Sequence, residues 1–194
     1  MNAVIDSLRA EYERYKALAE ASIRQVADGD LPRTQVTGGN SIVSLCRHLG
    51  GNLRSRFTDF LTTDGEKPWR RRDEEFESPT TPRAELLSLW ESGWAALFGA
   101  LADLHSEDLD RPITIRGQSL SVIEALHRSL AHTAYHVGQI VQLAREWRGP
   151  DWTYLSIPPG ASTTYAAHPT LEKPASHARR LDAGGASSPE SPPD

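Results

Sequence analysis

The 194-residue sequence has one cysteine, Cys46, and no long run of apolar residues. A single cysteine excludes an internal disulfide framework and a cysteine-based zinc ribbon, and it fits a reducing compartment. No stretch approaches the roughly eighteen apolar residues of a membrane-spanning helix, and the amphipathic, acid-containing start is unlike a signal peptide. We therefore expect a cytoplasmic protein with no membrane partner.

A surplus of positive charge is also absent. The sequence has 21 Lys and Arg residues against 26 Asp and Glu residues, which gives a net charge of −5 with neutral histidines. Proteins that bind nucleic acids usually concentrate an excess of basic residues on one face. We therefore expect no nucleic-acid partner.

Apolar residues recur at three- and four-residue steps in four long segments, as they do on the buried face of a helix. Asn40 or Ser41 can cap the second segment, and Pro82 suits the first turn of the third. Ser121 can form a capping box with Glu124 at the start of the fourth. We expect an all-α four-helix bundle whose helices cover residues 4–26, 42–60, 82–104 and 121–147.

Two further segments lie outside these helices. Residues 113–120 alternate in polarity across a two-residue turn that contains glycine, which predicts a very short β-hairpin before the last helix. From residue 166 the composition shifts to Pro, Ser, Ala, Gly and His. We therefore expect a bundle domain over residues 1–165 and a disordered tail over residues 166–194.

The connection between the second and third helices, residues 62–81, is long and highly charged. A connection of this length indicates either a functional loop or an element that periodicity does not reveal. Its Arg70-Arg71-Arg72 run could bind an anionic substrate, but acidic residues follow at once, so we expect a solvated, ion-paired loop. The segment could also form a lid over a pocket, anchored by Trp69 or Phe76.

Three of the seven histidines lie on the expected helices where they could act together. His132 and His136 are four residues apart, so both imidazoles lie on one face of the last helix. They flank its apolar stripe, as His48 flanks that of the second helix, so a shallow pocket between these helices could hold all three. The pair lacks the Glu of the metalloprotease motif, which argues against peptide hydrolysis by that mechanism. Three structural histidines, each with its own hydrogen-bond partner, are the alternative.

Longer runs of sequence carry a resemblance. LCRHLGGNLRSRF in the second helix, followed by HTAYHVGQIV in the fourth, resembles the DinB-like superfamily (DinB/YfiT) of bacterial four-helix proteins. Together with HTAYHVGQIV, the runs DGEKPWRRRDEEFE and WTYLSIPPG resemble a poorly characterised subfamily within it. The resemblance covers residues 2–160.

The resemblance implies a divalent metal ion, zinc or nickel, held by His48, His132 and His136, and it implies a homodimer. Some members of the superfamily transfer low-molecular-weight thiols or isomerise thiol-dependent substrates, and others have no known activity. Helical spacing places the amides of Asn52 and Gln139 near the site, where they could orient a ligand or support a histidine. The alternative interpretation is that Asn52 and Gln139 are ordinary polar residues on the surface.

These observations lead to two functional hypotheses. The first is a metal-binding protein that catalyses thiol-dependent transfer, or hydrolysis, on a small molecule, because three histidines leave a coordination position open. The second is a non-catalytic dimeric helical module with a structural or sensory metal, which fits the lack of an Asp, Glu or Lys beside the histidine pair. No catalytic residue is assigned. We expect Cys46 to be a buried core thiol, since it lies nearly opposite His48 on the helix.

Overall fold

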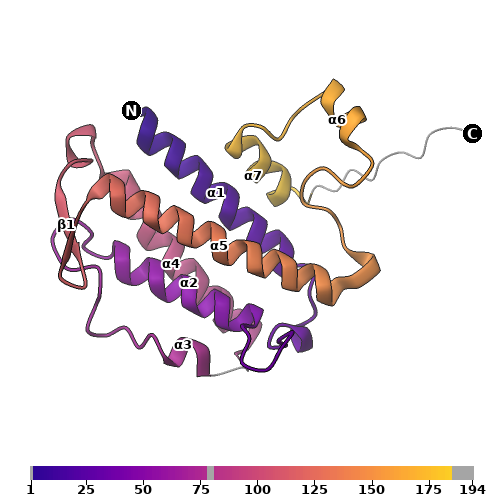
Figure 1. Cartoon of the computed structure of the whole chain (residues 1–194), viewed down its shortest axis with the longest axis horizontal. Coiled ribbons are helices and arrows are strands. Elements are labelled where there is room, and N and C mark those ends of the chain that lie inside the picture. The colour runs from indigo at the N-terminus through magenta and orange to yellow at the C-terminus, as the bar shows by residue number, and fades with distance from the viewer. Residues whose placement is uncertain (1, 78–80, 185–194) are drawn as a thin grey trace, which may run out of the picture.

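Four long helices form the body of the computed structural model, which describes residues 2–77 and 81–184 (Figure 1). Helix α2 packs mainly along α4, and α1 packs along α5. Their apolar faces meet in one core, in which the side chains of Leu49, Trp90 and Leu126 are fully buried. The predicted all-α four-helix bundle is therefore confirmed, with helices α1 (Ala3–Ile23), α2 (Ile42–Phe57), α4 (Arg83–Asp103) and α5 (Val122–Arg148).

The helices bordering the histidines begin as the sequence predicts. The Ser41 side chain accepts a hydrogen bond from the Ser44 backbone N–H, and the Ser44 hydroxyl interacts with the Ser41 backbone in return. Ser121 and Glu124 form the expected capping box at the start of α5. These caps satisfy backbone N–H groups that have no partner within the helix, and so they fix where α2 and α5 start.

Helices α2 and α4 approach each other at two glycines. A Cβ atom on Gly93 would lie 2.5 Å from the backbone oxygen of Gly50, and a Cβ on Gly50 would lie 2.8 Å from the backbone oxygen of Leu89. Real Cβ atoms do not come this close to backbone atoms, so the side-chain-free positions allow the two helices to pack in direct backbone contact.

The predicted hairpin is confirmed, and it lies at one end of the bundle (Figure 1). Strands β1 (Pro112–Ile115) and β2 (Gln118–Ser121) pair antiparallel, and both turn residues, Arg116 and Gly117, have positive φ angles of 55° and 72°. This conformation matches the right-handed twist of the two strands. The Asp64 carboxylate accepts hydrogen bonds from both turn N–H groups at 2.8 Å, which attaches the hairpin to the 62–81 connection.

Short helices complete the structure. Within the 62–81 connection lies α3 (Glu74–Glu77), an element that the hydrophobic pattern did not reveal. The others are η1 (Asp28–Asp30), η2 (Ser106–Asp108), η3 (Gly149–Asp151), α6 (Ser162–Ala167) and α7 (Pro174–Asp182). None of the helices within the described residues combines the length and the apolarity that a membrane crossing needs.

The expectation of disorder from residue 166 onward is not met over residues 166–184. Helix α7 packs on α1, where Ala178 and Leu181 are buried against Ala17 and Ala21. The ring of His177 is also buried, and its Nε2 atom donates a hydrogen bond to the Leu155 backbone oxygen over 2.7 Å. Three of the four buried residues in this contact are alanines, so the composition of the segment did not indicate it. The rest of the expected tail, residues 185–194, lies outside the described residues.

Candidate metal centre

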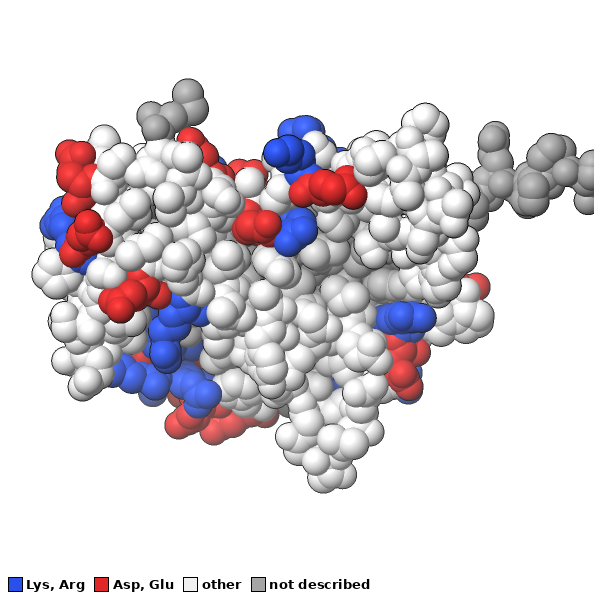
Figure 2. Space-filling model, turned by 45° about the horizontal axis from the view of Figure 1, so that its top comes forward, with Lys and Arg blue, Asp and Glu red and all other residues white. Residues whose placement is uncertain are grey.

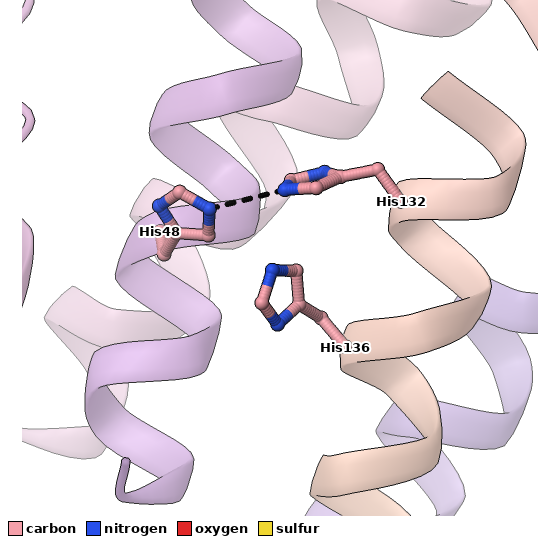
Figure 3. A group of neighbouring side chains, drawn as sticks. All are labelled: His48, His132 and His136. Carbon is pink, nitrogen blue, oxygen red and sulfur yellow. Dashed lines mark hydrogen bonds between the residues drawn. The ribbon is translucent and has the colours of Figure 1, made fainter. Parts of the chain in front are cut away.

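Three histidine side chains meet between α2 and α5. His48 projects from α2, and His132 and His136 project from successive turns of α5 toward the same space (Figure 3). One ring nitrogen from each lies within 4.8 Å of the other two. The Nε2 atoms of His48 and His132 are 3.2 Å apart. The three imidazoles therefore meet between these two helices, as the helical angles predicted.

The spacing of these nitrogens fits a metal ion. Zinc binds imidazole nitrogen at roughly 2.0–2.1 Å, so two ligands of a tetrahedral ion lie about 3.3 Å apart. The 3.2 Å separation between His48 and His132 is close to that value. The donor set of three imidazoles suits zinc, nickel, copper and iron alike, so it does not identify the metal.

A carboxylate that sequence reasoning missed orients His48. The Nδ1 atom of His48 donates a hydrogen bond to the Oε2 atom of Glu75 over 2.9 Å. Arg70 holds the same carboxylate through Nε and Nη2, each at 2.9 Å from an oxygen. Burial raises the pKa of Glu75, but the hydrogen bonds from His48 and Arg70 outweigh it and keep this pKa below its usual value.

The ionised Glu75 carboxylate fixes the tautomer of His48. A carboxylate can only accept hydrogen bonds, so the proton of the neutral His48 ring resides on Nδ1. The lone pair of its Nε2 atom then faces His132 and His136. This is the arrangement found at many metal centres, in which an outer carboxylate orients a histidine ligand and increases its basicity.

Gln139 acts on His136 in the same way. The Nδ1 atom of His136 donates a hydrogen bond to the Oε1 atom of Gln139 over 2.8 Å. The Nε2 lone pair of His136 is therefore also free to face the centre. Asn52, the other amide selected from the sequence, lines the cavity next to His48 and His132 and is half-buried.

The surroundings keep the rings of His132 and His136 neutral. Burial, followed by the neighbouring His136 and His48 rings and the charge of Arg70, lowers the pKa of His132 to about 3. Burial also lowers the pKa of His136, against the opposing hydrogen bond to Gln139. The Nδ1 atom of His132 is buried and has no hydrogen-bond partner among the described residues. Neutral imidazole is the form that binds metal, so both rings are ready to act as ligands near neutral pH.

The Arg70-Arg71-Arg72 run is only partly the solvated loop that its composition suggested. The side chain of Arg70 is 2% exposed and that of Glu75 is 10% exposed, so this ion pair is buried against the centre. Arg71 and Arg72 do remain largely exposed, with acidic partners. Burial of Arg70 is possible because Glu75, five residues further on, neutralises its charge in a bidentate ion pair.

The two aromatic residues of this segment differ in position. The Phe76 ring packs on His48, with the ring centres 4.9 Å apart, and so covers one side of the centre. Trp69 is 47% exposed and lies under the guanidinium of Arg54. Phe76 is therefore the aromatic contact that ties the segment to the histidines.

Cys46 lies away from the centre, as the helical spacing predicts. Its side chain is buried in the core between the helices, and burial raises the pKa of the thiol. A neutral thiol in this position contributes packing and no metal ligand.

A cavity of about 370 Å³ opens beside the histidines. It lies between α2, α5, the hairpin and the 62–81 connection, and it reaches His48 and His132. A ligand in this cavity would lie next to an open coordination position of a metal held by the three histidines. Its lining consists of His48, Asn52, Arg56, Phe57, Phe60, Arg70, Arg72, Ile115, Arg116, Ala125, Arg128, Ser129 and His132.

Comparison with known proteins identifies the family but no activity. No curated protein and no solved structure matches the chain. A family described as a protein of unknown function, DUF1572, matches residues 1–161. These residues include the whole bundle, the three histidines, Glu75 and every residue that lines the cavity. The chain belongs to the DUF1572 family.

Proposed function

We propose that this chain is a DinB-like metal-binding protein in which His48, His132 and His136 hold a divalent zinc or nickel ion. The observation that carries the proposal is the convergence of the three ring nitrogens within 4.8 Å, together with the Nδ1 hydrogen bonds of His48 and His136. Three structural histidines would not need their remaining nitrogens to face one another. Such an arrangement places lone pairs in mutual repulsion unless a proton or a cation lies between them.

We infer that the site serves a reaction on a small molecule, either thiol-dependent transfer or hydrolysis. When bound, a divalent ion with an open position lowers the pKa of a water or thiol ligand and supplies a nucleophile near neutral pH. The chain's own residues position the reactants. Glu75 and Gln139 hold two of the histidine ligands, and Asn52 offers an amide to a substrate in the cavity.

Metal content tests the first part of this proposal. The purified protein is expected to hold one divalent ion per chain, measured by inductively coupled plasma mass spectrometry. His132→Ala should lose that ion, whereas His127→Ala should retain it, because His127 is exposed on the same helix and outside the cluster. A protein that binds no stoichiometric metal, or an unchanged metal content in His132→Ala, would refute the proposal.

Turnover tests the second part. We expect a screen of low-molecular-weight thiols with electrophilic acceptors, and of hydrolysable esters and amides, to find a reaction that stops when a chelator removes the metal. Metal-dependent thermal stabilisation without any turnover would instead support the non-catalytic module. Glu75 favours neither outcome, since it is held by Arg70 and His48 and is not free to move a proton.

We also propose that the protein is a cytoplasmic homodimer. The single thiol, Cys46, is buried, which agrees with a reducing compartment. The dimer rests on the resemblance to DinB-like proteins. Sedimentation equilibrium of the purified chain tests it, and a mass of one chain across the micromolar range would exclude it.

A further inference from the structure

The charged residues that line the cavity beside the histidines are all positive. Five arginines contribute to its lining, and no Asp or Glu does so among the residues that the structure describes. This distribution contrasts with the net charge of −5 for the whole chain. Figure 2 shows basic side chains gathered near the hairpin end of the molecule, with acidic side chains around them. The arginines are Arg56, Arg70, Arg72, Arg116 and Arg128.

Nearby carboxylates balance only part of this charge. Glu66 is shared by two of the arginines, Arg56 at 3.1 Å and Arg116 at 2.9 Å. Glu75 is already engaged by Arg70 and by His48. Arg72 has a contact of 3.5 Å with the exposed Asp73, which water weakens strongly. The cavity therefore keeps a positive excess before any metal ion is counted.

Arg128 is the cavity arginine without a counter-charge. It forms no hydrogen bond or ion pair with the residues that the structure describes, and its side chain is exposed at the cavity. It lies four residues before His132 on α5, so Arg128, His132 and His136 share one face of that helix. A ligand that contacts Arg128 would therefore also lie beside the proposed metal.

Arg70 adds a second unsatisfied donor. Its side chain is 2% exposed, and its Nη1 atom is buried with no hydrogen-bond partner among the described residues. Leaving a guanidinium N–H without an acceptor is costly in a buried position. An oxygen of a bound anion would satisfy that donor, since Arg70 borders the cavity.

We propose that this cavity binds a small organic anion, consisting of an apolar group that bears a carboxylate or a phosphate. The oxyanion would contact Arg128, Arg72 and Arg70, and the apolar group would pack on Phe57, Phe60 and Ile115. The volume of about 370 Å³ suits a molecule of this size. The assignment of this anion as the substrate class rests on the proposed metal-dependent function, whereas the binding of the anion does not require the metal.

Benzoate and benzamide are a matched pair of probes, because they share shape and differ in charge. We would use metal-free protein, prepared with a chelator that is then dialysed away because the chelator is itself an anion. Titration calorimetry at low ionic strength is expected to detect binding of benzoate and not of benzamide. Phenyl phosphate in the same assay distinguishes a preference for phosphate from one for carboxylate, and binding of either anion supports the proposal.

Two substitutions of exposed arginines on the same helix locate the site. Arg128→Gln should weaken benzoate binding at least tenfold, because it removes the donor with no other partner. Arg145→Gln should leave binding unchanged, since Arg145 lies seventeen residues further along α5, about 25 Å away at the rise of an α-helix. Equal weakening in both variants would overturn the proposal, because it would indicate a diffuse attraction to positive charge.

A repeat with zinc-loaded protein separates this inference from the proposed function. Benzoate that binds only in the presence of zinc, and equally well to Arg128→Gln, would overturn the inference, since the ion alone would then hold the anion. The inference would also be overturned if neither benzoate nor phenyl phosphate bound to the metal-free or to the zinc-loaded protein. Arg128-dependent binding in a protein that takes up no zinc would support the inference and refute the metal-dependent function.

Discussion

Helix α2 faces two very different neighbours. On the α4 side the backbones touch through Gly50 and Gly93, and the surrounding side chains are apolar. On the α5 side, His48 meets two further histidines and a cavity. His48 and Gly50 are two residues apart and so lie on opposite sides of the helix.

The difference shows that α2 packs tightly on its α4 side and gathers polar side chains and a cavity on its α5 side. Close backbone contact on the α4 side holds α2 in a fixed position. That rigidity allows the α5 side to keep polar groups and open space, which contribute little to stability themselves. The predictions below alter one side of α2 at a time, from the largest expected effect to the smallest.

Gly93→Ala should have the largest effect, because it disrupts the close packing of α2 on α4. Its Cβ would lie 2.5 Å from the Gly50 backbone oxygen, so the two helices would have to separate. We expect the free energy of unfolding to fall by about 3 kcal/mol, as for a severe case of overpacking. Urea denaturation measures this loss.

Gly99→Ala is the control for that experiment. Gly99 lies on the same helix, and a Cβ atom there would meet nothing within 4 Å. Alanine should therefore stabilise the protein by up to about 1 kcal/mol through helix propensity. Equal destabilisation by both substitutions would contradict the close contact between α2 and α4.

A bound metal ion should stabilise the protein through the histidines on the α5 side of α2 and not through the contact with α4. Zinc at a free concentration one hundred times its dissociation constant is expected to raise the free energy of unfolding by about 2.7 kcal/mol. Thermal melting with and without zinc measures the effect. His132→Ala should abolish the gain, and Gly93→Ala should retain it while melting at a lower temperature throughout. A gain that survives in His132→Ala would place the metal elsewhere.

Glu75→Gln tests whether the Glu75 carboxylate supports metal binding by orienting His48. The two oxygens of the Glu75 carboxylate accept one hydrogen bond from His48 and two from Arg70. The amide of glutamine has only one oxygen that can accept hydrogen bonds. We expect zinc affinity to fall roughly 10–100-fold, measured by competition with a chelator of known affinity. Glu74→Gln is the matched control on the same short helix, because Glu74 is exposed and its partner is Arg71, away from the histidines. Unchanged affinity in Glu75→Gln would remove Glu75 from the site.

Asp64→Asn should have the smallest effect, at the hairpin end of the cavity. Backbone N–H groups of Glu66, Gly117 and Arg116 lower the pKa of Asp64 to about 2, against an ordinary value of 3.8. Because the folded-state pKa is depressed, the stabilisation is full above about pH 4 and disappears as the pH falls toward 2.

We expect Asp64→Asn to lose about 1 kcal/mol at pH 7, after allowance for solvent screening at this accessible site. The difference from the unmodified protein should vanish near pH 2, as urea denaturation at several pH values would reveal. A difference that stays constant across that range would show that the charge of Asp64 does not hold the hairpin.

The four helices could be predicted because each signal is local. Apolar periodicity, the caps at Ser41 and Ser121, and the two-residue turn at Gly117 depend on residues close in sequence. The convergence of His48 with the α5 pair was a weaker inference from helical angles, and only the resemblance linked the three histidines.

Glu75 and Arg70 could not be found in the same way. They lie in a charged segment without periodicity, and Glu75 is 27 residues from the histidine that it orients. The charged composition of this segment predicts that all of it is solvated. Composition cannot indicate that one ion pair is buried while its neighbours are exposed. Helix α7 was missed for a similar reason, since its contact with α1 is made mainly by small residues.

The distance along the chain between the clustered histidines has a consequence for the kinetics of folding and unfolding. His48 and His132 are 84 residues apart, so the complete centre cannot exist before α2 and α5 have docked. An ion that binds only the finished arrangement leaves the rate of refolding nearly unchanged and slows unfolding. Loading with metal would therefore lengthen the lifetime of the native chain and would not hasten its formation.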